Sequence, residues 1–177
     1  MTQKQHFTGF SQSIYELINQ RAPLDVVLSA ISSVMENELP QALVSVMLYV
    51  PETNTLNMVA GSSFSETYRK AMQGIGVGPN HGACGTAAHY QELTVCDDLA
   101  NDGRWRGFHD ICAREDLAAC WSTPLVDTSG NLLGTFATYY RNNRKPTDGE
   151  IKLIRRAASL VVLAITHQQE ISRRESS

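Results

Sequence analysis

The sequence predicts an α+β fold built on a central antiparallel β-sheet, with helices at both ends of the chain. The first observation is a hairpin pattern in residues 119–141, ACWSTPLVDTSGNLLGTFATYYR. The second is another hairpin pattern in residues 42–60, and the third is helical periodicity at each end. Since hairpins pair their strands antiparallel, these patterns together indicate a sheet covered by terminal helices.

In residues 119–141, two apolar runs flank the turn residues Asp127-Thr128-Ser129-Gly130. Asp can bond its own backbone and Gly accepts a positive φ, so we predict a four-residue turn closed by a bulge at Gly130. Both faces of each run carry apolar residues, which indicates strands inside a sheet covered on both sides. Pro124 loses a ladder hydrogen bond, so we expect a bulge or an edge there.

The N-terminal part predicts two helices and a hairpin. Apolar residues from Phe10 to Ile18 recur at helical spacing and predict a helix over residues 8–20. Pro23 suits the first turn of a second amphipathic helix, which ends before Pro40. Residues 42–50 and 55–60 are short and rich in β-branched side chains, and the turn PETN separates them. These two strands form the second hairpin.

The middle of the chain is less regular. Residues 63–66, SFSE, predict a capping box that opens a short helix carrying Tyr68 and Met72. Five glycines between Gly74 and Gly85 indicate a loop with unusual backbone angles, or a backbone pressed against a neighbour. We then expect helical turns at 86–90, a strand at 93–97, a polar loop at 101–107 and a helix at 108–115.

The last helix begins with the capping box of residues 147–150, TDGE. It carries two neighbouring apolar seams, wider together than contact with one sheet requires. One seam can cover the sheet while the other meets the first helix or a second chain. The near-heptad spacing of both seams predicts a homodimer that pairs through terminal helices.

Composition limits the functional classes. The chain has 177 residues, 42% hydrophobic and 19% charged, which fits one globular domain. A net charge of -3 and scattered basic residues argue against nucleic-acid binding. There is no apolar run of roughly 18 residues and no signal-peptide pattern, so we expect a cytoplasmic protein without membrane contact. Its four cysteines form no CxxC pair and are expected as free thiols.

Four segments in order resemble a bacterial signal-transduction subgroup of GAF domains: GVGP (76–79), ACGTAA (83–88), ACWSTP (119–124) and GTFATYY (134–140). The likeness predicts an N-terminal helix at 1–21, a GAF domain at 22–170 and a polar tail or linker at 171–177. It implies terminal helices on one face of the sheet and, on the other, a small-molecule pocket formed by short helices and loops. It also implies an output domain in a longer protein, such as a histidine kinase or a cyclic-di-GMP enzyme.

From this resemblance we expect a non-catalytic sensor that binds an unidentified small ligand, or senses redox state at Cys84, and signals through its terminal helices. Aromatic walls with a few polar groups are typical of small-ligand sites. The candidate pocket residues are Tyr68, His81, Cys84, Trp105, His109, Trp121 and Thr123.

Other chemistries stay open. His81-x-x-Cys84 and His109-x-x-Cys112 have a spacing that could supply four zinc ligands, although no CxxC accompanies them. The glycine-rich loop lacks the Gly-Lys-Ser/Thr of a P-loop but could present amides to phosphate. No cofactor is identified, and haem held by a lone histidine is disfavoured.

Two rival functions remain beside the sensor. The GACG segment at 82–85 resembles free methionine-R-sulfoxide reductases, themselves GAF domains, which would need a Cys84 of low pKa and a resolving Cys96 or Cys112. The family's further Pro-Gly-His and Ala-Cys-Asp segment is missing between Cys96 and Cys120. The other rival is a dimerisation module with a vestigial pocket.

Overall fold

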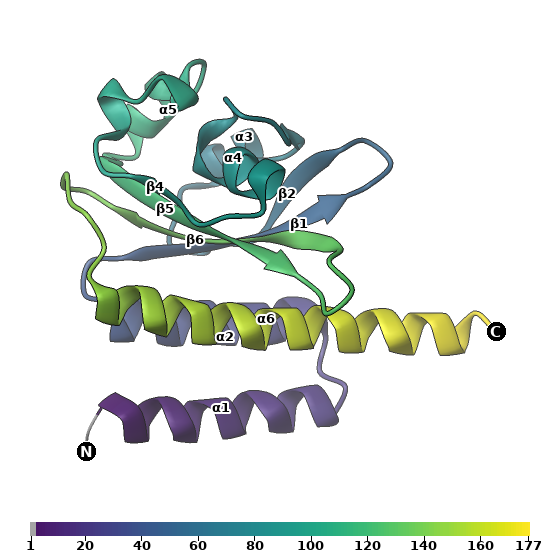
Figure 1. The fold of residues 1–177 in the computed structure, drawn as a ribbon. Coiled ribbons are helices and arrows are strands. Elements are labelled where there is room, and N and C mark those ends of the chain that lie inside the picture. Colours follow the sequence, from purple (N-terminus) through teal and green to yellow (C-terminus); the bar gives the residue numbers. More distant parts are fainter. Residues whose placement is uncertain (1–2) are drawn as a thin grey trace.

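The computed structural model describes residues 3–177 and shows one six-stranded sheet between two helical layers (Figure 1). The strand order is β3-β2-β1-β6-β5-β4, and every neighbouring pair is antiparallel. The two central strands are therefore β1 and β6, so the hairpin β5–β6 supplies one central strand and its neighbour. The strands are β1 Leu43–Val50, β2 Thr55–Ala60, β3 Ile75–Gly76, β4 Thr94–Cys96, β5 Ala119–Val126 and β6 Leu132–Tyr140.

One face of the sheet is covered by the terminal helices α2 (Leu24–Glu38) and α6 (Asp148–Glu175), and α1 (Gln3–Asn19) packs beneath them (Figure 1). Their apolar stripes meet the side chains of β5 and β6 in a large buried core that includes Ile31, Trp121, Phe136 and Val161. The helices are amphipathic, and within residues 3–177 none has the length and hydropathy to cross a membrane.

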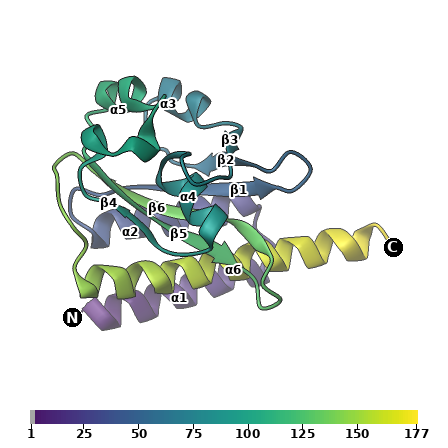
Figure 2. The same ribbon diagram turned by 45° about the horizontal axis from the view of Figure 1, so that its top comes forward.

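The opposite face carries three short helices, α3 (Glu66–Ala71), α4 (Gly82–Tyr90) and α5 (His109–Arg114), with 3₁₀ turns at Leu99–Asn101 and Gly103–Trp105 (Figure 2). They bury a second cluster against β1, β5 and β6 that includes Met47, Cys120 and Tyr139. Successive strand residues point to opposite faces, so β5 and β6 contribute to both cores. The pocket that the resemblance implies is expected in this layer of short helices and loops.

The central hairpin closes as predicted. The amide of Gly130 donates to the carbonyl of Asp127 at 3.0 Å, and Gly130 takes a φ of 84°. The Asp127 carboxylate accepts from the amides of Ser129 and Asn131, each at 2.9 Å. Pro124 lies beyond Ser122, the last residue that β5 pairs with β4, and the register shifts between Leu125 and Val126. Both the edge and the bulge expected near Pro124 are thus present.

Several element boundaries differ from the predictions. The first helix begins at Gln3 rather than near residue 8, while residues 1 and 2 of the predicted N-terminal helix lie outside the described residues. Ser65, not Ser63, caps α3, because its hydroxyl accepts from the amide of Tyr68 and Ser63 instead donates to Glu36. The capping box of Thr147 and Glu150 is confirmed, and α6 continues to Glu175.

Candidate functional site

A small cavity lies between the sheet and the short helices, on the face away from α6. Its volume open to the centre of a water molecule is about 10 Å³, which is space for about one water. The wall combines strand residues from β1 and β6 with residues from the start of α4 and the turn before α5. The lining residues are Met47, Met72, Ile75, His81, Gly82, Ala83, Cys84, Trp105, Phe108 and Tyr139.

The glycine-rich loop positions the start of α4, and it does so by close backbone packing. A Cβ added at Gly85 would lie 2.5 Å from the carbonyl oxygen of Gly76 and 2.5 Å from the Cβ of His81. A Cβ at Gly76 would lie 2.8 Å from the His81 ring. These distances leave no room for a side chain, which explains the glycines and confirms the expected backbone contact.

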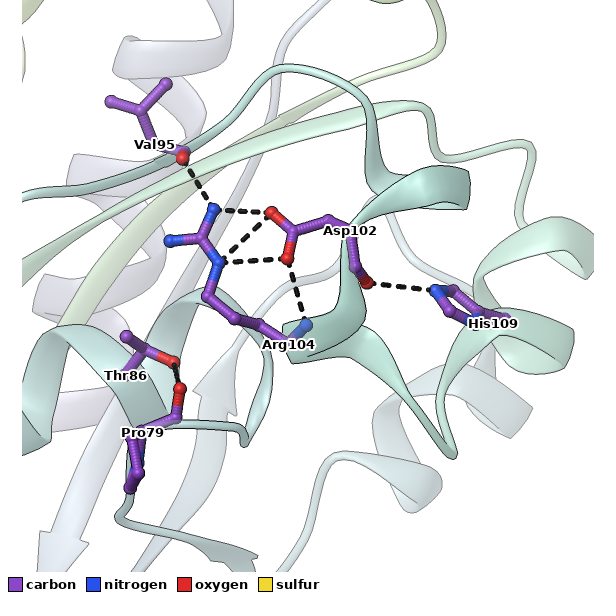
Figure 3. A network of polar contacts seen from close by, with 6 residues as sticks. All are labelled: Pro79, Thr86, Val95, Asp102, Arg104 and His109. Carbon is purple, nitrogen blue, oxygen red and sulfur yellow. Dashed lines mark hydrogen bonds and ion pairs between the residues drawn. The ribbon is translucent and has the colours of Figure 1, made fainter.

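Two amides of the glycine-rich loop bond carbonyls inside the protein. The amide of Gly78 donates to the carbonyl of Gly85 at 3.2 Å, and the amide of Val77 donates to the carbonyl of Asn54 at 3.2 Å. Thr86 donates its hydroxyl proton to the carbonyl of Pro79 at 3.1 Å, which ties the loop to α4 (Figure 3). These two amides already have partners and are therefore not available to an anion.

Cys84 lies in the first turn of α4 with its sulfur over the sheet. The hydroxyl of Ser122 donates to this sulfur at 3.3 Å, and the hydroxyl of Tyr139 lies 3.8 Å from it. Burial raises the pKa of the Cys84 thiol above its ordinary value, and the hydrogen bond from Ser122 only partly opposes this effect. The low pKa that the thiol-enzyme alternative requires of Cys84 is therefore not supported, because burial raises the pKa of this thiol.

The remaining three cysteines are also buried, free thiols in the same layer. Burial raises the pKa of Cys96 and of Cys112 to about 12 and that of Cys120 well above its ordinary range. A thiol attacks as the thiolate, so thiols with raised pKa values are poor nucleophiles and poor resolving partners at neutral pH.

Trp105 lines the cavity and belongs to the turn before α5. A polar network of Asp102, Arg104 and His109 lies in the same part of the chain (Figure 3). Asp102 caps this turn by accepting from the amide of Arg104 at 2.9 Å, and its carboxylate pairs with the Arg104 guanidinium. Arg104 also donates to the carbonyl of Val95 in β4 at 2.9 Å. The hydrogen bonds from Arg104 lower the pKa of Asp102 to about 2. The charges of Asp102 and Arg104 in this turn therefore compensate each other.

Of the other predicted pocket residues, two support the site and two lie elsewhere. Tyr68 is fully buried beside the cavity, with its ring 6.2 Å from that of Tyr139, but it does not line the wall. His109 contacts the carbonyl of Asp102 through Nε2 at 3.2 Å and belongs to the supporting network (Figure 3).

Trp121 and Thr123 are on the wrong face for the pocket. Trp121 packs in the core beneath the terminal helices, with its ring stacked 4.6 Å from that of Tyr140. Thr123 follows two residues later on β5 and shares that face. The alternation of β5 places Cys120, not Trp121, in the cavity layer. Placing Trp121 and Thr123 in the pocket is corrected accordingly.

The two His–Cys pairs do not converge on a metal site. His81 and Cys84 belong to the cavity, while Cys112 is buried in α5 and His109 is turned to Asp102. Among residues 3–177, no group of three or more His, Cys, Asp or Glu side chains is arranged to hold a metal ion.

Sequence reasoning missed much of the apolar wall, notably Met47, Phe108 and Tyr139. Tyr139 could have been found from strand alternation, since it shares a face with Ala137 and lies opposite Cys120. Met47 and Phe108 come from distant segments, and no local pattern reports that they meet.

Comparison with known proteins agrees with this architecture. The model of the family described as GAF domain matches residues 21–166. The chain belongs to the GAF domain family. A curated relative, the methyl sulfide methyltransferase-associated sensor of Methanosarcina acetivorans, is 34% identical over 156 residues. The match covers 88% of this chain and 16% of that sensor, so the chain corresponds to a small part of its relative.

Solved structures share the GAF fold. A domain of a putative two-component sensor histidine kinase from Sinorhizobium meliloti 1021 is 23% identical with a TM-score of 0.71, covering 86% of this chain and 97% of that chain. The reduced form of fRMsr of Staphylococcus aureus is 16% identical with a TM-score of 0.69, covering 90% and 94%. At these identities the likeness concerns the fold, so any enzymatic activity has to be argued from this chain's own cysteines.

Proposed function

We propose that this GAF domain is a non-catalytic regulatory domain that binds a small molecule in the cavity and passes the change to an output domain through α6. The family and the sensor named among its relatives support a sensory role. A ligand shifts such a system only if it binds two arrangements of the protein with different affinity. The arrangement of β6 suggests where those two states differ.

Two consecutive tyrosines of β6 carry this proposal. Tyr139 lines the cavity, whereas Tyr140 points through the opposite face of the sheet toward α6. The hydroxyl of Tyr140 donates to the Glu150 carboxylate at 3.2 Å, in the first turn of α6. A displacement of β6 by a ligand against Tyr139 would therefore change the contact that Tyr140 makes with α6.

The start of α6 collects several such contacts around Glu150. Its carboxylate accepts from Arg144 at 2.6 Å and from the amide of Thr147 at 2.9 Å. The Arg144 guanidinium lies over the ring of Tyr140, 4.4 Å from its centroid. Charged hydrogen bonds that are partly buried are stronger than neutral ones, so this cluster couples the strand to the helix.

We further propose that the domain works in the cytoplasm as a homodimer and precedes a kinase or cyclic-di-GMP output domain. Kinase association is suggested by the histidine kinase domain among the structural neighbours. Leu163 on α6 and Tyr15 on α1 are exposed by 40% and 43%, which supports pairing through the terminal helices. The division into an N-terminal helix (1–21), a domain (22–170) and a tail or linker (171–177) remains part of this proposal.

The thiol enzyme is the less favoured alternative, because burial raises the pKa of all four cysteines. The same argument weakens redox sensing at Cys84. Thioredoxin-coupled turnover of free methionine sulfoxide would establish the enzyme in place of the sensor.

A thermal-shift screen with amino acids, aromatic acids, cyclic nucleotides and small apolar molecules tests the sensor proposal. A ligand at 100 times its Kd should stabilise the domain by roughly 2.7 kcal/mol. That corresponds to a rise in Tm of roughly 5 to 10 °C for a domain of this size. We expect a ligand to raise Tm in the unaltered chain, and we expect no rise when a substitution fills the cavity. A ligand that binds equally well to the filled variant would contradict the proposed site.

A further inference from the structure

The cavity wall within the described residues contains no Asp, Glu, Lys or Arg. His81, at the exposed edge of the cavity, is the only basic side chain of the wall. The Arg104 guanidinium, next in sequence to the wall residue Trp105, is paired with Asp102 and bonded to the carbonyl of Val95. An anionic or zwitterionic ligand in the apolar part of the cavity, away from His81, would lose its hydration without gaining a compensating charge.

Two polar groups of the wall contact partners inside the protein, whereas the buried indole Nε1 of Trp105 has no hydrogen-bond partner. The Cys84 sulfur accepts from Ser122, and the Tyr139 hydroxyl lies beside that sulfur. Apart from His81 at the edge, the Trp105 N–H is the side-chain group of the wall left to bond a ligand, so a ligand with many hydrogen-bonding groups would leave most of them without a partner. The rest of the wall offers apolar and aromatic surface from Trp105 and Phe108, which meet edge to face with ring centroids 6.5 Å apart.

The volume of the cavity further limits the class of ligand that it can bind. The cavity has space for about one water. A nucleotide would therefore require the layer of short helices to move away from the sheet. Met47 and Met72 form part of the wall, and methionine side chains repack readily around a guest. A few additional atoms can therefore be accommodated by these two side chains without moving the sheet.

We propose that this cavity binds a small, uncharged, apolar molecule between Met47, Met72, Cys84, Trp105 and Phe108. The inference rests on the proposed sensor function and specifies the class of its ligand. Polarisable groups such as a thioether sulfur gain most from this wall, because sulfur makes favourable contacts with aromatic rings. Dimethyl sulfide is a suitable probe, and the trimethylsulfonium ion is its charged counterpart.

The test uses the indole N–H signals of the two tryptophans in ¹H–¹⁵N NMR spectra of the full chain. Dimethyl sulfide should shift the Trp105 signal saturably, while the Trp121 signal beyond the sheet moves much less and serves as an internal reference. Trimethylsulfonium and cyclic AMP should bind at least tenfold more weakly. Absence of a saturable shift at Trp105, or an equal response to trimethylsulfonium, would overturn the proposal.

Substitutions in and outside the cavity test where dimethyl sulfide binds. Ala83→Leu fills the cavity and should abolish the Trp105 shift, whereas Ala113→Leu makes the same change on the exposed side of α5 and should preserve it. Should Ala83→Leu not fold, Met72→Ala enlarges the cavity and should bind diethyl sulfide at least tenfold more tightly than the unaltered chain. Unchanged binding in either folded variant would contradict the site.

Failure of this inference and failure of the sensor proposal can be told apart. A charged probe that binds the cavity as tightly as dimethyl sulfide would refute the ligand class and leave the sensor proposal intact. Conversely, dimethyl sulfide that binds without any response in α6 would support the ligand class and refute the relay.

Discussion

The hydroxyl of Ser122 donates a hydrogen bond to the sulfur of Cys84 across 3.3 Å, joining strand β5 to the start of α4. Both residues are buried, and the contact lies directly beneath the cavity. A cysteine held in this way is a neutral packing residue with a weak polar contact rather than an exposed thiolate. Its chemistry and its position therefore favour ligand binding over catalysis.

Thiol reactivity tests this interpretation of Cys84. In the folded chain at neutral pH, the raised pKa values keep all four thiols protonated, so labelling by a thiol reagent should be slow. Denaturant should make all four react rapidly. Labelling of a single thiol within seconds in the folded chain, lost in Cys84→Ala, would instead support an enzymatic or redox role for Cys84.

Substitution of Gly85 tests the packing that positions the cavity wall. Gly85→Ala places a Cβ 2.5 Å from the Gly76 carbonyl oxygen, which is backbone and cannot rotate away. We expect a loss of about 1–3 kcal/mol in the free energy of unfolding, measured by urea denaturation. Gly103→Ala is the matched control, because its new Cβ meets no atom within 4 Å. Equal stabilities of the two variants would contradict the proposed packing.

Arg144 tests the cluster at the start of α6. Arg144→Lys retains the charge but loses the planar group that lies over Tyr140, so we expect a loss of about 1 kcal/mol in unfolding free energy. The neighbouring Lys145→Ala removes only an exposed ion pair with Asp97, 3.7 Å long, and should change stability little. A larger effect at Lys145 than at Arg144 would show that the cluster is not coupled to stability.

The Asp102–Arg104 pair makes stability depend on pH in the acid range. The folded-state pKa of Asp102 is lowered to about 2, so its contribution is present above the unfolded value near 4 and disappears as pH falls through about 2. At neutral pH, Asp102→Asn should lose about 1 kcal/mol, a modest value because solvent screens a partly exposed pair. The difference between variant and parent should shrink between pH 4 and pH 2. A difference that stays constant across this range would assign the loss to packing rather than to charge.

Local sequence signals predicted most elements of this fold, but not which face of the sheet forms the pocket. The turn at Asp127–Gly130 and the capping box at Thr147 depend on nearby residues alone, so both can be predicted from the local sequence. Trp121 and Cys120 differ in this respect. The alternation of side chains along β5 places the two residues on opposite faces of the sheet. Because both faces are apolar, the pattern does not show which residue meets the terminal helices.

The cavity wall was harder to predict for a related reason. Met47, Phe108 and Tyr139 come from three segments that only the folded sheet brings together. The strand β3 was also missed, because two residues, Ile75 and Gly76, carry too little pattern to predict a strand. The glycine cluster indicated close packing correctly, but the partner, His81 and its own loop, could be identified only in three dimensions.

The relay from cavity to α6 is tested most directly by amide hydrogen exchange in residues 147–154, compared between the free chain and the chain saturated with dimethyl sulfide or another ligand from the screen. We predict a change in protection at these amides, and a smaller one in Tyr140→Phe, which lacks the hydrogen bond to Glu150. Exchange in α6 that is identical with and without bound ligand would contradict the account.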